Sequence, residues 1–193
     1  MIKKRRRIGI LGGTFNPIHL GHLALAKESA ELLGLEKVIF VPTNLPPHKS
    51  TEELLPADQR YRMIALAIKS NPVFKVSDLE IRRGGLSYSI ETVRAFKSIY
   101  AHRNLYFIVG SDFLREFSTW KDIAKLSKSC KFVIAQRPGF VIKRLHKNMQ
   151  SISITAFDIS STDIRKRIRL KKSIQYLVPE EVRKYILRKK LYC

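Results

Sequence analysis

The sequence has few cysteines and no long apolar run. Its 193 residues include two cysteines, Cys130 and Cys193, which are far apart and lack metal-ligand spacing. This pattern is typical of a reducing cytoplasm and argues against a disulfide-stabilised secreted domain. No apolar segment approaches the roughly 18 residues that a membrane helix needs. We therefore expect a soluble, cytoplasmic protein that does not associate with membranes.

Acidic residues are also scarce. The chain has 16 Asp and Glu against 37 Lys and Arg, which gives a formal charge of +21. A cationic surface attracts polyanions, so nucleotide phosphate or nucleic acid is the expected class of partner. The charges are dispersed along helical segments with few aromatic residues between them, which favours a solvated basic surface. Weak nonspecific nucleic-acid binding stays open as a secondary property.

Length and composition predict one compact domain over residues 1–193, because 45% apolar residues in a chain of this size can bury a core. Residues 1–6 form a basic N-terminal extension. It resembles the start of a signal peptide, but glycines interrupt the few apolar residues that follow, so we expect no export. No internal repeat or domain boundary is visible, and the sequence does not predict an oligomeric state.

Short apolar runs alternate with helical patterns along the chain. The expected strands are residues 8–11, 38–41, 74–77, 105–109 and 132–135. Apolar residues at three- and four-residue spacing predict amphipathic helices at 23–33, 60–68, 90–99 and 120–126. This alternation indicates an α/β fold with a doubly wound parallel sheet. Segments 159–170 and 179–191 predict extra C-terminal helices.

Two irregular segments interrupt this pattern. They are VPTNLPPHKSTEELLP at 41–56 and EIRRGGLSYS at 80–89. Long irregular segments in a compact domain often shape a binding site, although mobility alone would also explain them. We interpret both segments as walls of a site.

The first expected strand runs into Gly12 and Gly13, and a helix follows closely. This arrangement lets a phosphate approach backbone N–H groups and a helix N-terminus, but the glycine pattern is neither G-x-G-x-x-G nor Walker A. His19 and His22 stand one helical turn apart. Two imidazoles beside N-terminal N–H groups suit the stabilisation of charge on phosphorus. A zinc site and a purely capping role are the alternatives.

The stretch GGTFNPIHLGH resembles the signature of the H-x-G-H nucleotidyltransferases, and further matches narrow this to the bacterial nicotinate-nucleotide adenylyltransferases. These are PPHK at 46–49, RRGGLSYSIETV from Arg82, GSDFL from Gly110, WKDI from Trp120, RPG from Arg137 and ISSTDIR from Ile159. They occur in family order over most of the chain. The resemblance implies a Rossmann-like enzyme of NAD biosynthesis, which joins ATP and nicotinate mononucleotide into nicotinate adenine dinucleotide and pyrophosphate.

For the ATP half of the site, the resemblance implies that His22 faces the α-phosphate, that His19 faces the leaving group, and that Thr14 assists them. The implied ATP-binding residues are Gly12, Gly13, Gly110, Asp112, Ser161, Thr162 and Arg165. Mg²⁺ would arrive on the triphosphate, and no protein-held metal is expected. A helix N-cap is the structural alternative for Asp112, and ordinary helix capping is the alternative for Ser161 and Thr162.

For the second substrate, the implied contacts are Phe15, Asn16, His48, Lys49, Tyr88, Ser89, Trp120 and Arg137. The Trp120 ring offers a stacking surface for a pyridine, although a lone tryptophan is more often core. The family more commonly has Asp at Asn16, Thr at Ser89 and Asp at Glu91. The alternative functions are a relative that uses nicotinamide mononucleotide or phosphopantetheine, and a basic nucleic-acid-binding protein.

Overall fold

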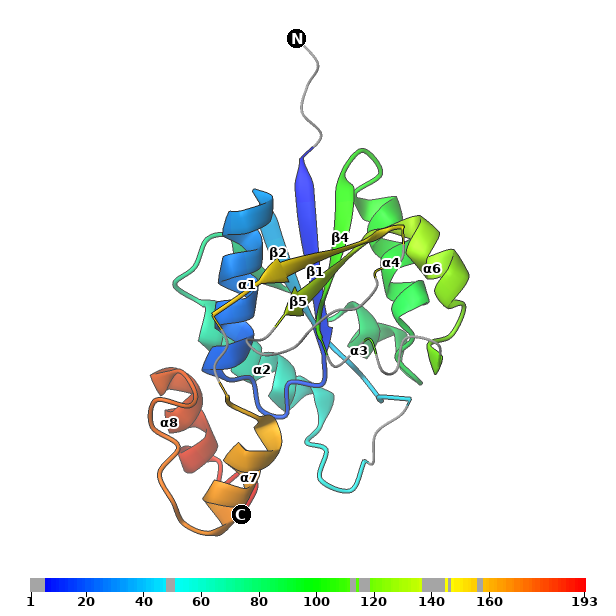
Figure 1. Cartoon of the computed structure of the whole chain (residues 1–193). Helices are drawn as coiled ribbons and strands as arrows, with labels where there is room; N and C mark the ends of the chain where they lie inside the picture. Colours follow the sequence, from blue (N-terminus) through cyan, green and yellow to red (C-terminus); the bar gives the residue numbers. More distant parts are fainter. Residues whose placement is uncertain are drawn as a thin grey trace.

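The computed structural model describes residues 6–47, 51–111, 114, 119–136, 145, 147–155 and 158–193. Within this part of the chain, parallel strands form one six-stranded sheet in the order β3-β2-β1-β4-β5-β6 (Figure 1). The strands are β1 (Arg7–Gly13), β2 (Lys37–Pro42), β3 (Phe74–Val76), β4 (Asn104–Gly110), β5 (Lys131–Gln136) and β6 (Met149–Ser153). The prediction of a doubly wound, Rossmann-like α/β fold is confirmed.

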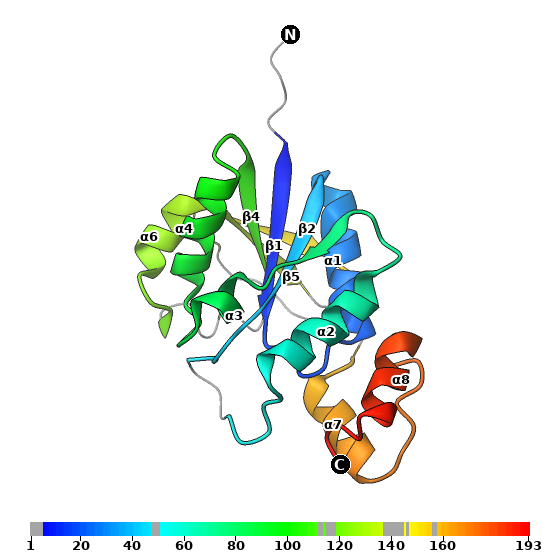
Figure 2. The ribbon, with the colours of Figure 1, turned by 180° about the vertical axis from the view of Figure 1, so that it is seen from behind.

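Helices cover both faces of the sheet, as the two opposite views show (Figures 1 and 2). The helices are α1 (Leu20–Leu33), α2 (Ala57–Ile68), α3 (Leu79–Arg83), α4 (Ser89–Ile99), α6 (Ile123–Ser129), α7 (Ser161–Arg169) and α8 (Glu180–Arg188). Side chains of β1 alternate between two cores. Leu11 belongs to the core that also contains residues of α1, α2, α7 and α8, whereas Ile8 and Ile10 belong to the core that contains residues of α4 and α6.

The two C-terminal helices lie beyond the carboxyl edge of the sheet, next to α1 and α2 (Figures 1 and 2). Their apolar faces are buried through Ile164, Val182 and Ile186. The backbone N–H of Leu20 donates to the carbonyl of Leu177 at 3.0 Å. The predicted extra helices therefore exist, and they bring residues after 160 beside the start of α1.

Three local predictions were wrong. The edge strand β6 was missed because only Met149 and Ile152 are buried along it, which leaves a weak apolar signal. The helix expected from residue 120 begins at Ile123, because Asp122 before it has a left-handed backbone with φ 53°. The short helix α3 falls inside a segment expected to be irregular, and it ends at Gly84, whose φ is 71°.

The strand order reverses at β1. The chain moves from β1 to β2 and β3 on one side of the sheet, and from β4 to β5 and β6 on the other. In open α/β sheets, ligands bind at the carboxyl ends of the strands beside such a reversal. No helix in the described ranges is both long enough and apolar enough to cross a membrane.

Candidate active site

A cleft of about 780 Å³ opens at the carboxyl ends of β1 and β4. Gly12, Gly13 and Gly110 form part of its lining. The segments 41–56 and 80–89 both contribute wall residues, as the sequence predicted. The volume is within the range of small-molecule sites, so the cleft is the candidate active site.

Most of the predicted site residues meet at this cleft. The lining includes Gly12, Gly13, Thr14, Phe15, Asn16, His22, Tyr88, Ser89, Gly110, Trp120, Ser161, Thr162 and Arg165. His19 is 7% exposed and is not among the lining residues. His48, Lys49, Asp112 and Arg137 lie outside the described residues.

The turn between β1 and α1 is tightly packed. A Cβ atom at Gly13 would lie 3.0 Å from the Phe15 ring, so only glycine fits there without a shift of that ring. Phe15 has a φ of 50° and is 2% exposed, and its ring meets the His22 ring edge-on with centroids 4.9 Å apart. The ring of Phe15 therefore supports His22 from the core side.

The two histidine rings lie against each other at the start of α1, tilted by 31°. His19 is the N-cap residue, and its backbone N–H donates to Nδ1 of His22 at 3.2 Å. The ring centroids are 3.7 Å apart. Because Nδ1 of His22 accepts this hydrogen bond, we assign the proton of the neutral ring to Nε2. Nε2 is thus the donor nitrogen of His22, and Nδ1 is held by the backbone N–H of His19 at the start of the same helix.

The start of α7 faces the same turn. Ser160 is its N-cap, and its hydroxyl oxygen accepts from the backbone N–H of Asp163 at 3.0 Å. The next residue, Ser161, donates its hydroxyl to the carbonyl of Pro17 at 2.8 Å. The capping role is therefore filled by Ser160, and Ser161 and Thr162 occupy the first helical positions, where backbone N–H groups favour an anion.

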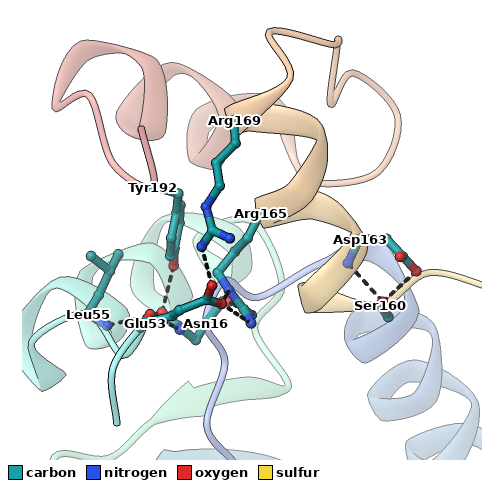
Figure 3. Close-up of polar contacts among 8 residues, drawn as sticks. All are labelled: Asn16, Glu53, Leu55, Ser160, Asp163, Arg165, Arg169 and Tyr192. Atoms are coloured by element: carbon teal, nitrogen blue, oxygen red, sulfur yellow. Dashed lines mark hydrogen bonds and ion pairs between the residues drawn. The ribbon is translucent and has the colours of Figure 1, made fainter. Parts of the chain in front are cut away.

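Arg165 and Arg169 point from α7 toward Glu53 (Figure 3). Nε and Nη2 of Arg165 donate to Oε2 of Glu53 at 3.0 and 2.8 Å, and Nη1 donates to the Asn16 carbonyl at 3.0 Å. Arg169 forms an ion pair with Oε1 of Glu53 at 2.6 Å. Hydrogen bonds from Arg165 and then Arg169 hold the pKa of Glu53 below its ordinary value. We call Glu53, Arg165 and Arg169 the rim cluster.

Asn16 connects three segments beside this cluster (Figure 3). Its Nδ2 donates to the Glu53 carbonyl at 2.8 Å, and its Oδ1 accepts from the Leu55 N–H at 3.3 Å and the Tyr192 hydroxyl at 2.9 Å. A carboxylate at this position could accept but could not donate to the Glu53 carbonyl. The amide that departs from the family's commoner Asp therefore suits these internal contacts.

The opposite wall is aromatic and partly charged. Trp120 lies before α6, and its ring meets Phe107 edge-on with centroids 6.0 Å apart. Nζ of Lys121 lies 4.0 Å from the Tyr88 ring centroid and 3.2 Å from Glu91. Trp120 is half-buried and lines the cleft, so its ring combines core packing with access to a ligand.

Glu80 is a cleft residue that sequence reasoning missed. It is buried, and its Oε1 accepts a short hydrogen bond from the Thr92 hydroxyl. Burial raises its pKa, while hydrogen bonds from Thr92 and Ser87 act in the opposite direction. Ser87 in turn accepts from the Asn44 backbone N–H at 2.8 Å. Sequence analysis interpreted its segment, 80–89, as a wall of the site, but it did not single out Glu80.

Arg60 is the second missed residue. Although 0% exposed, it donates from Nε, Nη1 and Nη2 to the carbonyls of Leu55, Thr14 and Asn44 at 2.8, 2.8 and 2.9 Å. We call this arrangement the buried joint, since it connects the turn after β1 to the walls of the cleft. A signal was present, because Arg60 shares a helix face with the apolar Met63 and Ile64.

Comparison with known proteins agrees with this geometry. A family model described as cytidylyltransferase-like matches residues 10–167. A Moorella thermoacetica protein named "probable nicotinate-nucleotide adenylyltransferase" is 44% identical over 100% of this chain and 94% of its own length. The chain belongs to the cytidylyltransferase-like family and, within it, to the nicotinate-nucleotide adenylyltransferases. The family resemblance that the motifs indicated is therefore confirmed.

Two further proteins are also similar to this chain. A Desulfitobacterium hafniense (strain Y51) protein with the same name is 43% identical over 97% of this chain and 96% of its own. The structure of Plasmodium falciparum nicotinic acid mononucleotide adenylyltransferase complexed with NaAD has a TM-score of 0.83 over 97% of both chains, at 22% identity. At that identity, the structural likeness supports the fold.

The described residues contain no group of three or more His, Cys, Asp and Glu that could hold a metal ion. His19 and His22 belong to no such group within these ranges, which do not include His48 and Asp112. Structural zinc sites need four protein ligands and catalytic ones three. The phosphate role of the histidine pair stays a prediction, with zinc as its alternative.

Proposed function

We propose that this protein transfers the adenylyl group of ATP to nicotinate mononucleotide, giving nicotinate adenine dinucleotide and pyrophosphate. The observation that carries the proposal is the convergence of His22, the start of α7 and Arg165 on one cleft at the reversal of strand order. The relatives at 43–44% identity that are named for this activity support the same reaction.

The chemistry needs no nucleophile from the protein. A phosphate oxygen of the mononucleotide attacks the α-phosphorus of ATP, and the bond from that phosphorus to the bridging oxygen breaks as pyrophosphate leaves. The attacking phosphate is largely ionised near neutral pH because its second pKa is about 6. The protein's task is to align the two phosphates and to stabilise the charge that develops between them.

In this proposal His22 donates Nε2–H to a non-bridging oxygen of the α-phosphate. The contact from the His19 backbone to Nδ1 fixes the ring in the orientation and tautomer that this donation requires. The N–H groups at Ser161 and Thr162 and the guanidinium of Arg165 would receive the outer phosphates. His19, buried behind His22, would act on the leaving group through the contact of the two rings.

Mg²⁺ would enter as part of the ATP substrate. Mg²⁺ prefers several waters and phosphate oxygens to a cage of protein ligands, so it would be carried by the triphosphate. Its contribution would be to neutralise charge on the β- and γ-phosphates. The rim arginines and the helix start would bind the same groups.

The wall formed by Tyr88, Ser89 and Trp120 would receive the pyridine. The exposed part of the Trp120 ring can stack on it, and the start of α4 can donate to its substituent. A donor-lined site pairs both oxygens of a carboxylate, but it leaves the N–H₂ of an amide facing other donors. We therefore propose preference for the acid over nicotinamide mononucleotide.

The deciding experiment measures pyrophosphate release with ATP and a panel of phosphates: nicotinate mononucleotide, nicotinamide mononucleotide and phosphopantetheine. We expect the highest kcat/KM with nicotinate mononucleotide, with the amide lower by a factor of about 5 to 150, the equivalent of 1 to 3 kcal/mol. Equal kcat/KM for acid and amide contradicts the selectivity, and turnover confined to phosphopantetheine contradicts the proposed reaction.

A further inference from the structure

We infer that Glu53 sets the affinity of this enzyme for ATP by competing with the triphosphate for Arg165. The Glu53 carboxylate binds the guanidinium of Arg165, which receives the outer phosphates of ATP under the proposed function. ATP then binds by displacing Glu53 from Arg165. The inference rests on the proposed function and adds to it a residue that weakens substrate binding.

The contacts at Arg165 carry the first step (Figure 3). Two of its nitrogens, Nε and Nη2, donate to the same Glu53 oxygen, and the third donates to the Asn16 carbonyl. Arg165 lines the cleft, with 14% of its side chain exposed. The edge of the guanidinium that suits an anion is therefore already engaged by an internal anion.

The second step is that this ion pair is exchangeable. Glu53 has 45% of its side chain exposed, so solvent can hydrate the carboxylate when it leaves Arg165. Water competes for the carboxylate of a half-exposed ion pair and reduces its net contribution to stability, so the Glu53 side of this pair is the side that can be released. A triphosphate brings several negative charges to the same cation and can replace a single carboxylate.

The third step concerns where the displaced carboxylate goes. Arg169 binds the other oxygen, Oε1, and Arg169 itself is half-exposed. Glu53 can therefore leave Arg165 and keep one cationic partner on the same helix. Displacement creates no buried unpaired charge, which would otherwise be strongly unfavourable.

A different role is possible for the same geometry, in which Glu53 holds Arg165 in the orientation that ATP needs. The two roles predict opposite results for Glu53→Gln. Removing a competitor strengthens ATP binding, whereas removing a positioning residue weakens it. Gln keeps the length of the side chain and one acceptor oxygen, but it removes the charge and replaces the other oxygen with an N–H₂ donor.

The experiment is equilibrium binding of ATP with Mg²⁺ to the full chain, without the second substrate. We expect Glu53→Gln to bind ATP about fivefold more tightly than the parent. A matched control is Glu31→Gln on α1, which also removes one negative charge. Glu31 is exposed and forms an ion pair with Lys27 at 3.6 Å, and it is not a cleft residue.

A double-mutant cycle tests whether Arg165 transmits the effect. We expect Glu53→Gln to change ATP affinity by less than about twofold in an Arg165→Gln background, because the contested cation is gone. An unchanged or weaker ATP affinity in the single variant overturns the inference. The same gain in both backgrounds also overturns it, since it would reflect the general field of the charge.

Failure of the inference and failure of the proposed function are separable. Binding of ATP is measured without turnover, and pyrophosphate release by the parent enzyme is measured independently. A parent that turns over both substrates while Glu53→Gln binds ATP no better keeps the function and loses the inference. A parent that neither binds ATP nor releases pyrophosphate loses both.

Discussion

Two arginines serve the same cleft in different ways. Arg60 is fully buried and donates to three backbone carbonyls, whereas Arg165 lies at the rim and donates mainly to the carboxylate of Glu53. Burial lowers the pKa of Arg60. At the rim, hydrogen bonds from Arg165 and Arg169 lower the pKa of Glu53. The buried joint has no solvent to exchange with, while the rim cluster does.

The difference separates two tasks. Neutral carbonyls on three segments fix Arg60 in one place, so this residue maintains the shape of the cleft. A single carboxylate can leave Arg165 to another anion, so this residue can bind substrate. Substitutions that affect shape should change stability, and substitutions that affect binding should change ATP affinity or turnover at nearly constant stability.

The largest effect is expected for His22→Ala, which removes a donor held by its own helix. We expect kcat to fall by about 10² to 10³, the scale for loss of one donor to a developing oxyanion. ATP affinity should change much less, because the helix start and Arg165 still bind the ground-state phosphates. The measurements are single-turnover rate, ATP binding and melting temperature.

The alternative of a purely capping histidine predicts the opposite pattern for this variant. The melting temperature would fall and kcat of the folded fraction would stay near that of the parent. Near-parental kcat in folded His22→Ala would therefore remove the catalytic assignment of the histidine pair.

Next in size is Arg60→Met, which breaks the buried joint. Three carbonyls lose their donor at about 1–3 kcal/mol each, and relief of a buried charge offsets part of that loss. We expect a net destabilisation of about 3 kcal/mol, or a melting temperature lower by about 6–12 °C. Thermal unfolding with and without ATP checks this result.

Arg60→Lys is the matched variant, because it keeps the charge and loses the planar set of donors. It should be destabilised nearly as much as Arg60→Met. A lysine variant with parental stability would mean that charge, and not the three directed hydrogen bonds, stabilises the joint.

A smaller effect is expected for Arg165→Gln at the rim. KM for ATP should rise about tenfold, which corresponds to ~1.4 kcal/mol of lost phosphate binding. The melting temperature should change little, because Arg169 still pairs with Glu53. Arg183→Gln on α8, which loses only an exposed pair with Glu180, serves as the control. A large loss of stability in Arg165→Gln would mean that this residue, like Arg60, maintains the shape of the cleft.

The smallest effect concerns Glu80 and pH. Because burial raises its folded pKa above the ordinary value of 4.5, folding favours the protonated carboxyl. Its contribution to stability is present below that value and is lost as pH rises through the folded pKa. As pH rises from 4.5 through the folded pKa of Glu80, the stability of Glu80→Gln relative to the parent should therefore increase, by less than about 1 kcal/mol.

Glu180→Gln offers a control with the opposite sign. The pKa of Glu180 is lowered by its hydrogen bond from Arg183, so its contribution is present above 4.5 and is lost as pH falls through the folded pKa. Above 4.5 this variant should lose stability relative to the parent. Parallel pH profiles for the two variants would contradict the assignment for Glu80.

Much of the fold followed from local patterns. Continuous apolar runs identified the four inner strands and the edge strand β3, and the stretch from Gly12 to His22 identified the turn that the structure places at the reversal of strand order. These features depend on neighbouring residues, which a sequence displays directly. The edge strand β6 was missed because it pairs on one side only and buries just Met149 and Ile152.

The contacts that shape the site were less accessible to prediction. Arg165 was identified as a phosphate ligand, but its pairing with Glu53 joins residues separated by 112 positions. Arg60 stands on the apolar face of a predicted helix and Glu80 begins a segment interpreted as a wall of the site, but neither pattern indicated their partners. Their roles depend on which carbonyls and hydroxyls the finished fold brings near them, and local spacing carries no such information.

The contact of Tyr192 with Asn16 has a consequence for the order of synthesis. The two residues are 176 positions apart, and the Tyr192 hydroxyl donates to Asn16 beside the phosphate-binding turn. A chain emerging from the ribosome folds from its N-terminus onward, so the sheet can form while residue 192 is still untranslated. The turn at Asn16 is then made first and receives Tyr192 as a partner only after residue 192 has been translated. A nascent chain thus carries a folded sheet before it carries a finished cleft.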